Sequence, residues 1–313
     1  MSNGLSHRGD RRGHGEEQLE ESMTVDVIKT VGVLGAGTMG NGIAHAFSRA
    51  GYNVILRDVE QRFLDQAMET IGKNLDREVK KGKLAEVEKP AVLARLKMVT
   101  DFGMLAAADF VVEAVPEKLE IKRAVLTEVD KLLRPEVILA SNTSSISVTT
   151  LAAMTKRPDQ FVGMHFMNPV PVMVLVEVIR ALQTTDESFT TTMELAKRLG
   201  KTPVAVNDAP GFVSNRVLMP LINEAAYTVM EGVAMPEAVD AVMKLGMNHP
   251  MGPLELADFI GLDVCVDIMA VLLDGLGDQK YRACPLLKKY VAAGWLGRKS
   301  GRGFYSYEVA AKS

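Results

Sequence analysis

Residues Thr30–Asp58 read TVGVLGAGTMGNGIAHAFSRAGYNVILRD, and this stretch decides the fold class. A short apolar run, Val31–Leu34, leads into the glycine-rich sequence GAGTMG, and a helix-forming segment follows. Gly51 then begins a turn, and a second apolar run, Val54–Leu56, comes just before Asp58. Strand, helix and strand in this order predict one βαβ unit of a parallel sheet.

The glycines of this unit have the spacing of a dinucleotide-binding turn. Gly35 permits the tight turn, Gly37 lets a pyrophosphate approach the backbone, and Gly40 lets the helix pack closely on the strand. Thr38 and Met39 lie at the helix start, where free N–H groups can face a phosphate. We predict that these five residues bind a dinucleotide; the alternative is a tight turn in an ordinary α/β protein.

Asp58 follows the second strand, 18 residues beyond Gly40. A carboxylate at this place can accept hydrogen bonds from both hydroxyls of an adenosine ribose, and it would repel a 2′-phosphate. Asp58 therefore favours NAD over NADP as the cofactor. Arg57 beside it weakens that preference, because a guanidinium attracts phosphate.

Length and composition indicate a globular protein of two domains. The chain has 313 residues, of which 47% are hydrophobic and 24% are charged. A net charge of −3 and 5% aromatic residues give no basic face for nucleic acid. The two cysteines, Cys265 and Cys284, have no metal-ligand spacing and suit a reducing compartment. We therefore expect a small-molecule partner, no metal site and a cytoplasmic location.

The lengths of the apolar runs argue against a membrane-spanning protein, and the composition of residues 1–25 argues against a targeting peptide. No apolar run approaches the length of a membrane span. Residues 1–25 contain both basic and acidic pairs and resemble neither a signal peptide nor a transit peptide. We expect a solvated, disordered tail there and no membrane partner.

Helical and strand patterns continue to alternate until about residue 150. Phe110–Val115 and Val137–Ala140 are short apolar runs typical of strands buried on both faces, with a helical pattern between them. Gln61–Lys89 is rich in Lys and Glu and predicts a long, partly exposed helical pair. Its lysines, Lys81 among them, either form a solvated face or contact an anionic ligand such as a nucleotide phosphate.

Polar residues that directly follow strands are candidates for a site, because ligands collect outside the carboxyl ends of parallel strands. Glu117 and Lys122 follow one strand, and the five small polar residues 141–145 follow the next. Asn142 and Ser144 in this second segment lie where the nicotinamide end of a dinucleotide should bind. The alternative interpretation is a helix N-cap followed by a turn.

His165 and Glu177 are each isolated in an apolar strand. The strands Phe161–Phe166 and Val174–Ile179 are joined by MNPVP, and both residues lie at the same distance from Pro171. Antiparallel pairing would therefore place the imidazole opposite the carboxylate. A carboxylate on one ring nitrogen fixes the tautomer and raises the basicity of the other, as a general base requires. A lone histidine in a strand is more often a core residue, but here each residue explains the other's burial.

Strand patterns stop at about residue 208. Residues 208–211 read as a hinge, and an amphipathic helix follows, with Asn215 in its first turn and so near the cleft. Further helical stretches are predicted at 236–245, 252–273 and 285–293. The expected fold is an α/β, Rossmann-type doubly wound, mostly parallel sheet at 26–207, followed by an all-α domain at 208–313.

The chain resembles the L-3-hydroxyacyl-CoA dehydrogenase family, and within it the short single-function 3-hydroxybutyryl-CoA dehydrogenases of bacteria. The resemblance covers nearly everything after the tail and rests on six collinear motifs: VGVLGAGTMGNGIA, ASNTSSISVTTLA, GMHFMNPVPVMVLVEVI, DAPGFVSNRVLMPLINEA, KLGMNHPMGPLELADFIGLD and GWLGRKSGRGFY. Met167 lies where the family often has Phe, which is a mild departure near the nicotinamide.

The resemblance implies a role for each candidate residue. His165 is the general base, Glu177 orients it, Ser144 donates to the C3 oxygen of the substrate, and Asn215 binds the reacting end of the acyl group. Lys81 and its neighbours would contact the CoA nucleotide. The remaining polar candidates would contact the cofactor, namely Asp58, Glu117, Lys122, Asn142 and Asn168.

The activity that follows is NAD-dependent oxidation of an L-3-hydroxyacyl-CoA to a 3-ketoacyl-CoA, with a short acyl chain and a homodimer as in the family. One alternative is a related two-domain dehydrogenase of a free hydroxy acid or sugar acid. Another is a non-catalytic dinucleotide sensor, since a fold alone does not establish activity.

Overall fold

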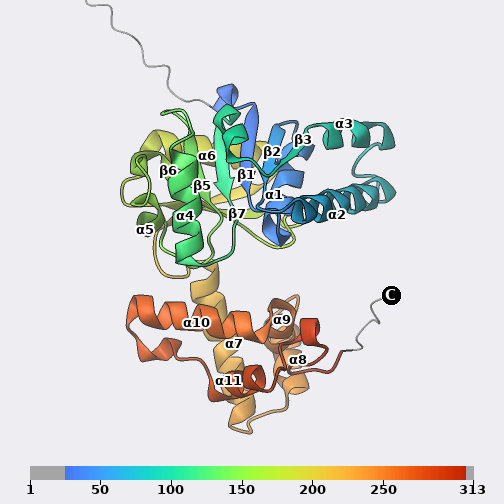
Figure 1. Ribbon diagram of the computed structural model, residues 1–313. Helices are drawn as coiled ribbons and strands as arrows, with labels where there is room; N and C mark the ends of the chain where they lie inside the picture. Colours follow the sequence, from blue (N-terminus) through green and yellow to red (C-terminus); the bar gives the residue numbers. More distant parts are fainter. Residues whose placement is uncertain (1–24, 308–313) are drawn as a thin grey trace, which may run out of the picture.

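The structure is a computed structural model that describes residues 25–307. A sheet flanked by helices comes first along the chain, and a group of helices follows it (Figure 1). The predicted disordered tail, residues 1–25, lies outside the described residues except for Val25, which begins the short 3-10 helix Val25–Val27.

In the described residues, eight strands form one sheet in the order β3-β2-β1-β4-β5-β6-β7-β8. Neighbouring strands are parallel except for β6 and β7, which are antiparallel. The first six strands have the order of a Rossmann-type doubly wound sheet, so the predicted fold class is confirmed. The strand bounds are β1 Thr30–Leu34, β2 Asn53–Arg57, β3 Leu96–Val99, β4 Phe110–Glu113, β5 Ile138–Ser141, β6 Phe161–Phe166, β7 Leu175–Arg180 and β8 Thr202–Asn207.

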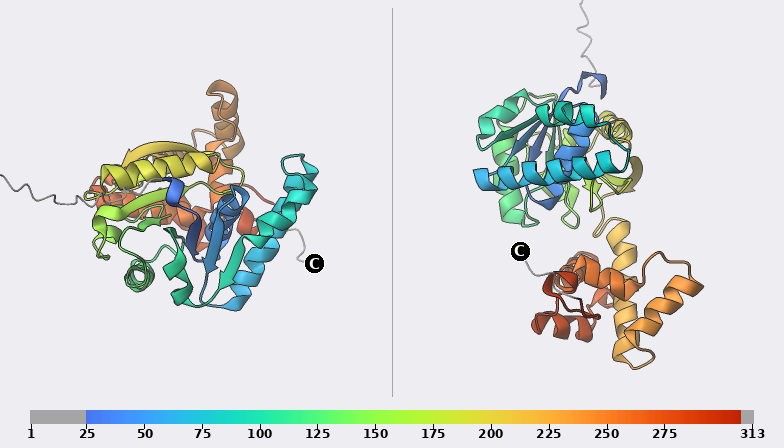
Figure 2. Two further views of the ribbon diagram at one scale, coloured as in Figure 1. Left: turned by 90° about the horizontal axis from the view of Figure 1, so that it is seen from above. Right: turned by 90° about the vertical axis from the view of Figure 1, so that its right-hand side faces the viewer.

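Helices cover both faces of this sheet (Figures 1 and 2). One apolar core contains buried residues of α1, α2 and α6, and a second core on the other face contains those of α4 and α5. Because both faces are covered, the central strands β4 and β5 are buried along their whole length and are apolar up to their last residues, Glu113 and Ser141. The helix bounds in this part are α1 Thr38–Arg49, α2 Gln61–Lys80, α3 Lys89–Ala94, α4 Leu119–Asp130, α5 Val148–Ala152 and α6 Asp186–Arg198.

The two outermost strands, β3 and β8, were not identified by the sequence pattern. They form the two edges of the sheet, where a strand has a neighbour on one side only. Most residues of β8 are exposed, and β3 mixes a lysine with apolar residues. The lysine interrupts the apolar pattern of β3, and the proline of β8, TPVAVN, argues against a central strand and is tolerated at a sheet edge.

The second part of the chain consists of helices, apart from two isolated β-bridges at residues 297–306, and has its own apolar core. The helical stretch predicted at 252–273 consists of two helices, because the chain breaks at Gly261, whose φ of 108° is disfavoured for other residues. Among the described residues, no helix combines the length and apolar composition that crossing a bilayer requires. The bounds are α7 Ser214–Met230, α8 Pro236–Gly246, α9 Pro253–Ile260, α10 Leu262–Leu276 and α11 Pro285–Ala292.

Arg157, in the connection between α5 and β6, holds the end of α4 in place. Its Nε donates to Asp130 Oδ1 at 2.6 Å, and both side chains are buried. Its two terminal nitrogens donate to carbonyl oxygens at the end of α4 and in the connection to β5, those of Asp130, Leu133, Arg134, Pro135 and Val137. One guanidinium thus satisfies several carbonyls that a helix end leaves without partners.

Replacing Arg157 by Met should lower the free energy of unfolding by about 3 kcal/mol or more, because Asp130 would remain buried without its charged partner. The matched control is Arg62→Met. Because Arg62 pairs with Glu60 on the surface, its replacement should lower the free energy of unfolding by no more than about 1 kcal/mol. Urea unfolding of both variants measures the difference. Equal midpoints would contradict the clamping role of Arg157.

Candidate active site

A cleft of about 1160 Å³ lies at the carboxyl ends of the sheet strands, between the sheet and the helical part. One wall consists of the turn after β1 and the loops after β2, β4, β5 and β6. The other wall is mostly apolar and comes from the helical part, with Leu218, Met219, Leu256, Phe259, Ile260, Val264 and Ile268. The polar residues predicted from the sequence and an apolar surface therefore share one space.

The glycine turn fits a dinucleotide phosphate. A Cβ at Gly40 would lie 1.7 Å from the Gly35 carbonyl oxygen, and Gly35 has a φ of +95°. At Gly37 a Cβ would meet nothing within 4 Å, so the space above this residue is open. Gly37, Thr38 and Met39 line the cleft at the start of α1, where the helix provides unpaired N–H groups. The residues present thus fit the pyrophosphate that the spacing predicts.

Asp58 is held beside this turn by two backbone donors. Its Oδ2 accepts from Ala36 N and its Oδ1 from Val59 N, both at 2.6 Å. Each oxygen keeps a lone pair for a ribose hydroxyl. Arg57 also lines the cleft, but its guanidinium stacks on the Phe102 ring at 3.7 Å, and burial lowers its pKa. The arginine is therefore partly engaged by the protein itself.

Glu117 organises the polar loop after β5. Its Oε1 accepts from Thr143 Oγ1 at 2.6 Å, Ser144 N at 2.9 Å and Ser145 N at 3.0 Å. Burial, the largest single influence, raises the pKa of Glu117, but the charge of Lys122 and these hydrogen bonds outweigh it and lower the pKa overall. The ionised carboxylate fixes the loop that carries Ser144.

Lys122 lies behind this loop and is 1% exposed. Its Nζ contacts Glu113 Oε1 at 2.7 Å, Glu113 Oε2 at 2.9 Å and Glu117 Oε2 at 3.1 Å. Lys122 does not line the cleft, whereas Glu117 does. The ammonium thus supports Glu117 from inside the fold, and direct contact of Lys122 with a cofactor stays a prediction.

His165 and Glu177 form the pair that the sequence predicts. β6 and β7 pair with His165 directly opposite Glu177, and His165 Nδ1 lies 2.8 Å from Glu177 Oε2. Because an ionised carboxylate can only accept, Nδ1 carries the proton and Nε2 keeps a free lone pair. His165 lines the cleft, and the ring of Phe212, directly after the hinge, packs against it with centroids 5.8 Å apart. This arrangement is suited to a general base.

Glu177 lies behind the histidine and is 2% exposed. Its Oε1 accepts from Val213 N at 3.1 Å and Ser214 N at 3.0 Å, and its Oε2 accepts from Ser214 Oγ at 2.8 Å. Burial, the largest influence, raises the pKa of Glu177, but the hydrogen bonds of His165 and Ser214 lower it below its usual value overall. Glu177 is therefore a carboxylate when the protein is folded at neutral pH.

Three further polar candidates, Asn142, Asn168 and Asn215, line the cleft, whereas Lys81 does not. Asn215 Nδ2 donates to the Ser144 carbonyl oxygen at 3.0 Å, which joins the helical part to the polar loop. Asn142 Oδ1 accepts from Phe166 N at 2.9 Å, and Asn168 lies in the loop after β6. Lys81 is exposed at the end of α2 and does not line the cleft. Its contact with a CoA nucleotide stays a prediction.

Two polar residues next to the site were not singled out from the sequence. Asp208 follows β8 and accepts from Ser147 Oγ at 2.7 Å, Val148 N at 3.1 Å and Thr149 N at 2.8 Å, so it caps α5. Ser214 is the donor to Glu177 described above. Asp208 is the first residue of the predicted hinge and Ser214 precedes Asn215, so proximity to these predicted features was the available signal.

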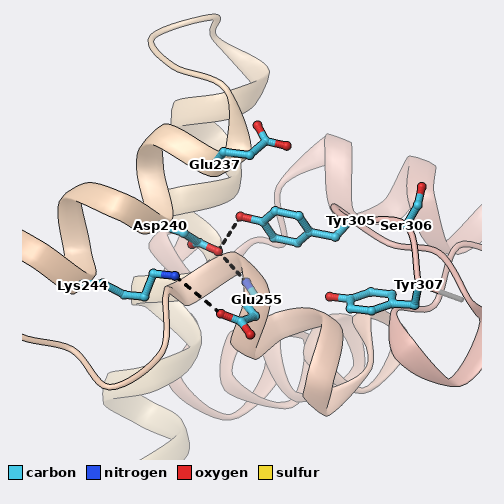
Figure 3. Close-up of a pocket in the computed structure, with 7 residues that line it drawn as sticks. All are labelled: Glu237, Asp240, Lys244, Glu255, Tyr305, Ser306 and Tyr307. Atoms are coloured by element: carbon cyan, nitrogen blue, oxygen red, sulfur yellow. Dashed lines mark hydrogen bonds and ion pairs between the residues drawn. The ribbon is translucent and has the colours of Figure 1, made fainter.

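A smaller hollow of about 380 Å³ lies within the helical part (Figure 3). Asp240 Oδ2 there accepts from Tyr305 Oη at 2.7 Å and Glu255 N at 2.8 Å. The protein's own donors thus satisfy its buried carboxylate. The hollow is lined by Glu237, Asp240, Lys244, Glu255, Tyr305, Ser306 and Tyr307.

Comparison with known proteins identifies the family to which the chain belongs. The family model "3-hydroxyacyl-CoA dehydrogenase, NAD binding domain" matches residues 30–209, and the C-terminal domain model of the same family matches residues 211–307. A 3-hydroxybutyryl-CoA dehydrogenase of Bradyrhizobium diazoefficiens is 55% identical over 284 residues, which cover 91% of this chain and 97% of that protein.

Two further proteins show the same likeness. A Bacillus subtilis (strain 168) protein named "Probable 3-hydroxybutyryl-CoA dehydrogenase" is 56% identical over 281 residues, covering 90% of this chain and 98% of its own. The crystal structure of (S)-3-hydroxybutyryl-CoA dehydrogenase PaaH1 from Ralstonia eutropha matches with a TM-score of 0.88 and 51% sequence identity. The match covers 90% of this chain and 100% of that chain. The chain therefore belongs to the 3-hydroxyacyl-CoA dehydrogenase family, and its sheet part is the NAD-binding domain of that family.

Proposed function

We propose that the protein oxidises an L-3-hydroxyacyl-CoA of short chain, such as 3-hydroxybutyryl-CoA, to the 3-ketoacyl-CoA, reversibly and with NAD. The observation that carries the proposal is the His165–Glu177 pair, which opens into the same cleft as the glycine turn. The printed names of the relatives above support the substrate class.

The chain's residues divide the chemistry between them. NAD, when bound, supplies the acceptor for the hydride from C3. Glu177 holds the proton of Nδ1, so His165 Nε2 is free to take the proton of the C3 hydroxyl. The Ser144 hydroxyl donates to the C3 oxygen, and Asn215, bonded to the Ser144 carbonyl, binds the reacting end of the acyl group. The apolar wall excludes water from the reacting atoms.

The helical part, from Asp208 onward, is proposed as the substrate-binding and dimerisation domain. Five exposed apolar residues on and beside α8 support a homodimer, since such patches mark interfaces; they are Val233, Met235, Val242, Leu245 and Met247. Analytical ultracentrifugation of the full chain tests the dimer. The cytoplasmic location is supported by two buried, unpaired cysteines, which suit a reducing compartment.

The direct test of the function compares acetoacetyl-CoA with free acetoacetate as oxidants of NADH, and NADH with NADPH as reductants. We expect rapid turnover with the thioester and NADH, because Asp58 would repel the 2′-phosphate of NADPH. Turnover of the free acid without the thioester would instead indicate the alternative class of hydroxy-acid dehydrogenases.

Replacing His165 by Gln should lower turnover by about 100-fold or more, because a general base contributes about 10²–10⁴-fold. The dissociation constant of NADH should change little, since the glycine turn and Asp58 remain. Steady-state kinetics and NADH fluorescence measure the two effects. His249→Gln, which alters a histidine outside the cleft, is the control. An active His165→Gln protein would place the base elsewhere.

The lowered pKa of Glu177 predicts an acid-dependent loss of stability. Its ionised form stabilises the folded state above the ordinary pKa of 4.5, and this contribution is lost as the pH falls from there through the lower folded value. Glu177→Gln should therefore be less stable than wild type at neutral pH and lose less stability on acidification. Urea unfolding at several pH values, with Glu128→Gln as the exposed control, measures this. Parallel pH dependences of wild type and Glu177→Gln would count against the pairing.

A further inference from the structure

The hydroxyl of Ser214 and the imidazole of His165, the candidate base, both form hydrogen bonds to one oxygen atom of Glu177. Ser214 is the first residue of α7, and its Oγ donates to Glu177 Oε2 at 2.8 Å. The same Oε2 lies 2.8 Å from His165 Nδ1. Two donors therefore compete for the electron density of one carboxylate oxygen, one from the helical part and one from the imidazole.

The other oxygen of Glu177 is bound by the start of the same helix. Val213 N and Ser214 N donate to Oε1 at 3.1 and 3.0 Å, and the N-cap residue Val213 provides no side-chain cap of its own. Glu177 thus caps α7 from another domain, and the helix dipole favours its negative charge. Ser214 adds the one side-chain donor that this cap receives from α7.

The more hydrogen bonds a carboxylate accepts, the more weakly it binds each further donor. A hydrogen bond to an ionised carboxylate stabilises the charge and makes it a weaker acceptor toward its remaining partner. Removing the Ser214 hydroxyl would leave Oε2 to His165 alone. The protonated imidazole would then be held more strongly, and the base would release its proton at a higher pH.

We propose that Ser214 is a positioning residue that weakens the hold of Glu177 on protonated His165 and so sets the pH range in which the base works. The inference rests on the proposed function, because it assigns Ser214 a role in that reaction. Ser214 acts through Glu177, whose oxygen it shares with the imidazole. Because Ser214 is the first residue of α7, a shift of the helix start would move its hydroxyl away from Glu177 and so change the basicity of His165.

The test compares Ser214→Ala with Ser214→Thr, which keeps the hydroxyl. In Ser214→Ala, the acidic limb of the kcat/KM profile for 3-hydroxybutyryl-CoA oxidation should move up by about half a pH unit. The KM for the acyl-CoA and the Kd for NADH should change by less than about two-fold. Ser214→Thr should restore the wild-type limb. Ser188→Ala, which removes a hydroxyl from the first turn of α6 outside the cleft, should leave the limb unchanged.

An unmoved limb in Ser214→Ala, with or without a loss of thermal stability, would overturn the proposal and leave Ser214 a purely structural cap. The low-field ¹H resonance of the His165 Nδ1 proton gives a second readout without turnover, and His165→Gln assigns it by its disappearance. Its titration should move in the same direction in Ser214→Ala. If wild type proved inactive on the thioester, the proposed function would fail, while this titration would still decide the role of Ser214.

Discussion

The buried carboxylate of Glu177 is the group on which the two parts of the molecule converge. A carboxylate enclosed without donors costs several kcal/mol, so its surroundings must supply them. One comes from the imidazole on β6, and three come from the first residues of α7. The same contacts satisfy N–H groups that the helix start leaves free. The position of His165, the proposed base, and that of the first helix of the second part therefore depend on each other.

The protein uses the same solution at two other places around the cleft. Glu117 accepts from the backbone of the loop that carries Ser144, and Asp208 accepts from the first turn of α5 just beyond that loop. Lys122, enclosed between Glu113 and Glu117, holds the first of these carboxylates in turn. Polar groups at the strand ends are thus fixed before a ligand arrives, which is the preorganisation that electrostatic catalysis requires.

Local patterns predicted the parts of the site whose physics is local. The glycine spacing determined the turn, because Gly35 and Gly40 each occupy positions where a Cβ would clash with backbone. The register of β6 and β7 followed from the symmetric positions of His165 and Glu177 about Pro171, and the structure confirms that pairing.

Features that depend on distant contacts could not be predicted in this way. The edge strand β8 contains a proline and is mostly exposed, and Gly261 ends α9 inside a continuous helical pattern. The donor role of Ser214 depends on a strand 37 residues earlier in the chain. Likewise, nothing in the helical pattern of α9 and α10 indicates that Phe259 and Val264 line the cleft and do not pack in the helical core.

The capping of α7 by Glu177 also determines when, during synthesis, the surroundings of Glu177 are complete. The sheet is complete at Asn207, before any residue of α7 has been synthesised. A chain that ends there contains the glycine turn, Asp58 and His165, but Glu177 lacks three of its four donors. Such a fragment contains the glycine turn, but Glu177, the partner of the proposed base His165, keeps only the imidazole as donor. The complete set of donors at Glu177, and with it the proposed base, therefore forms only after α7 has been synthesised.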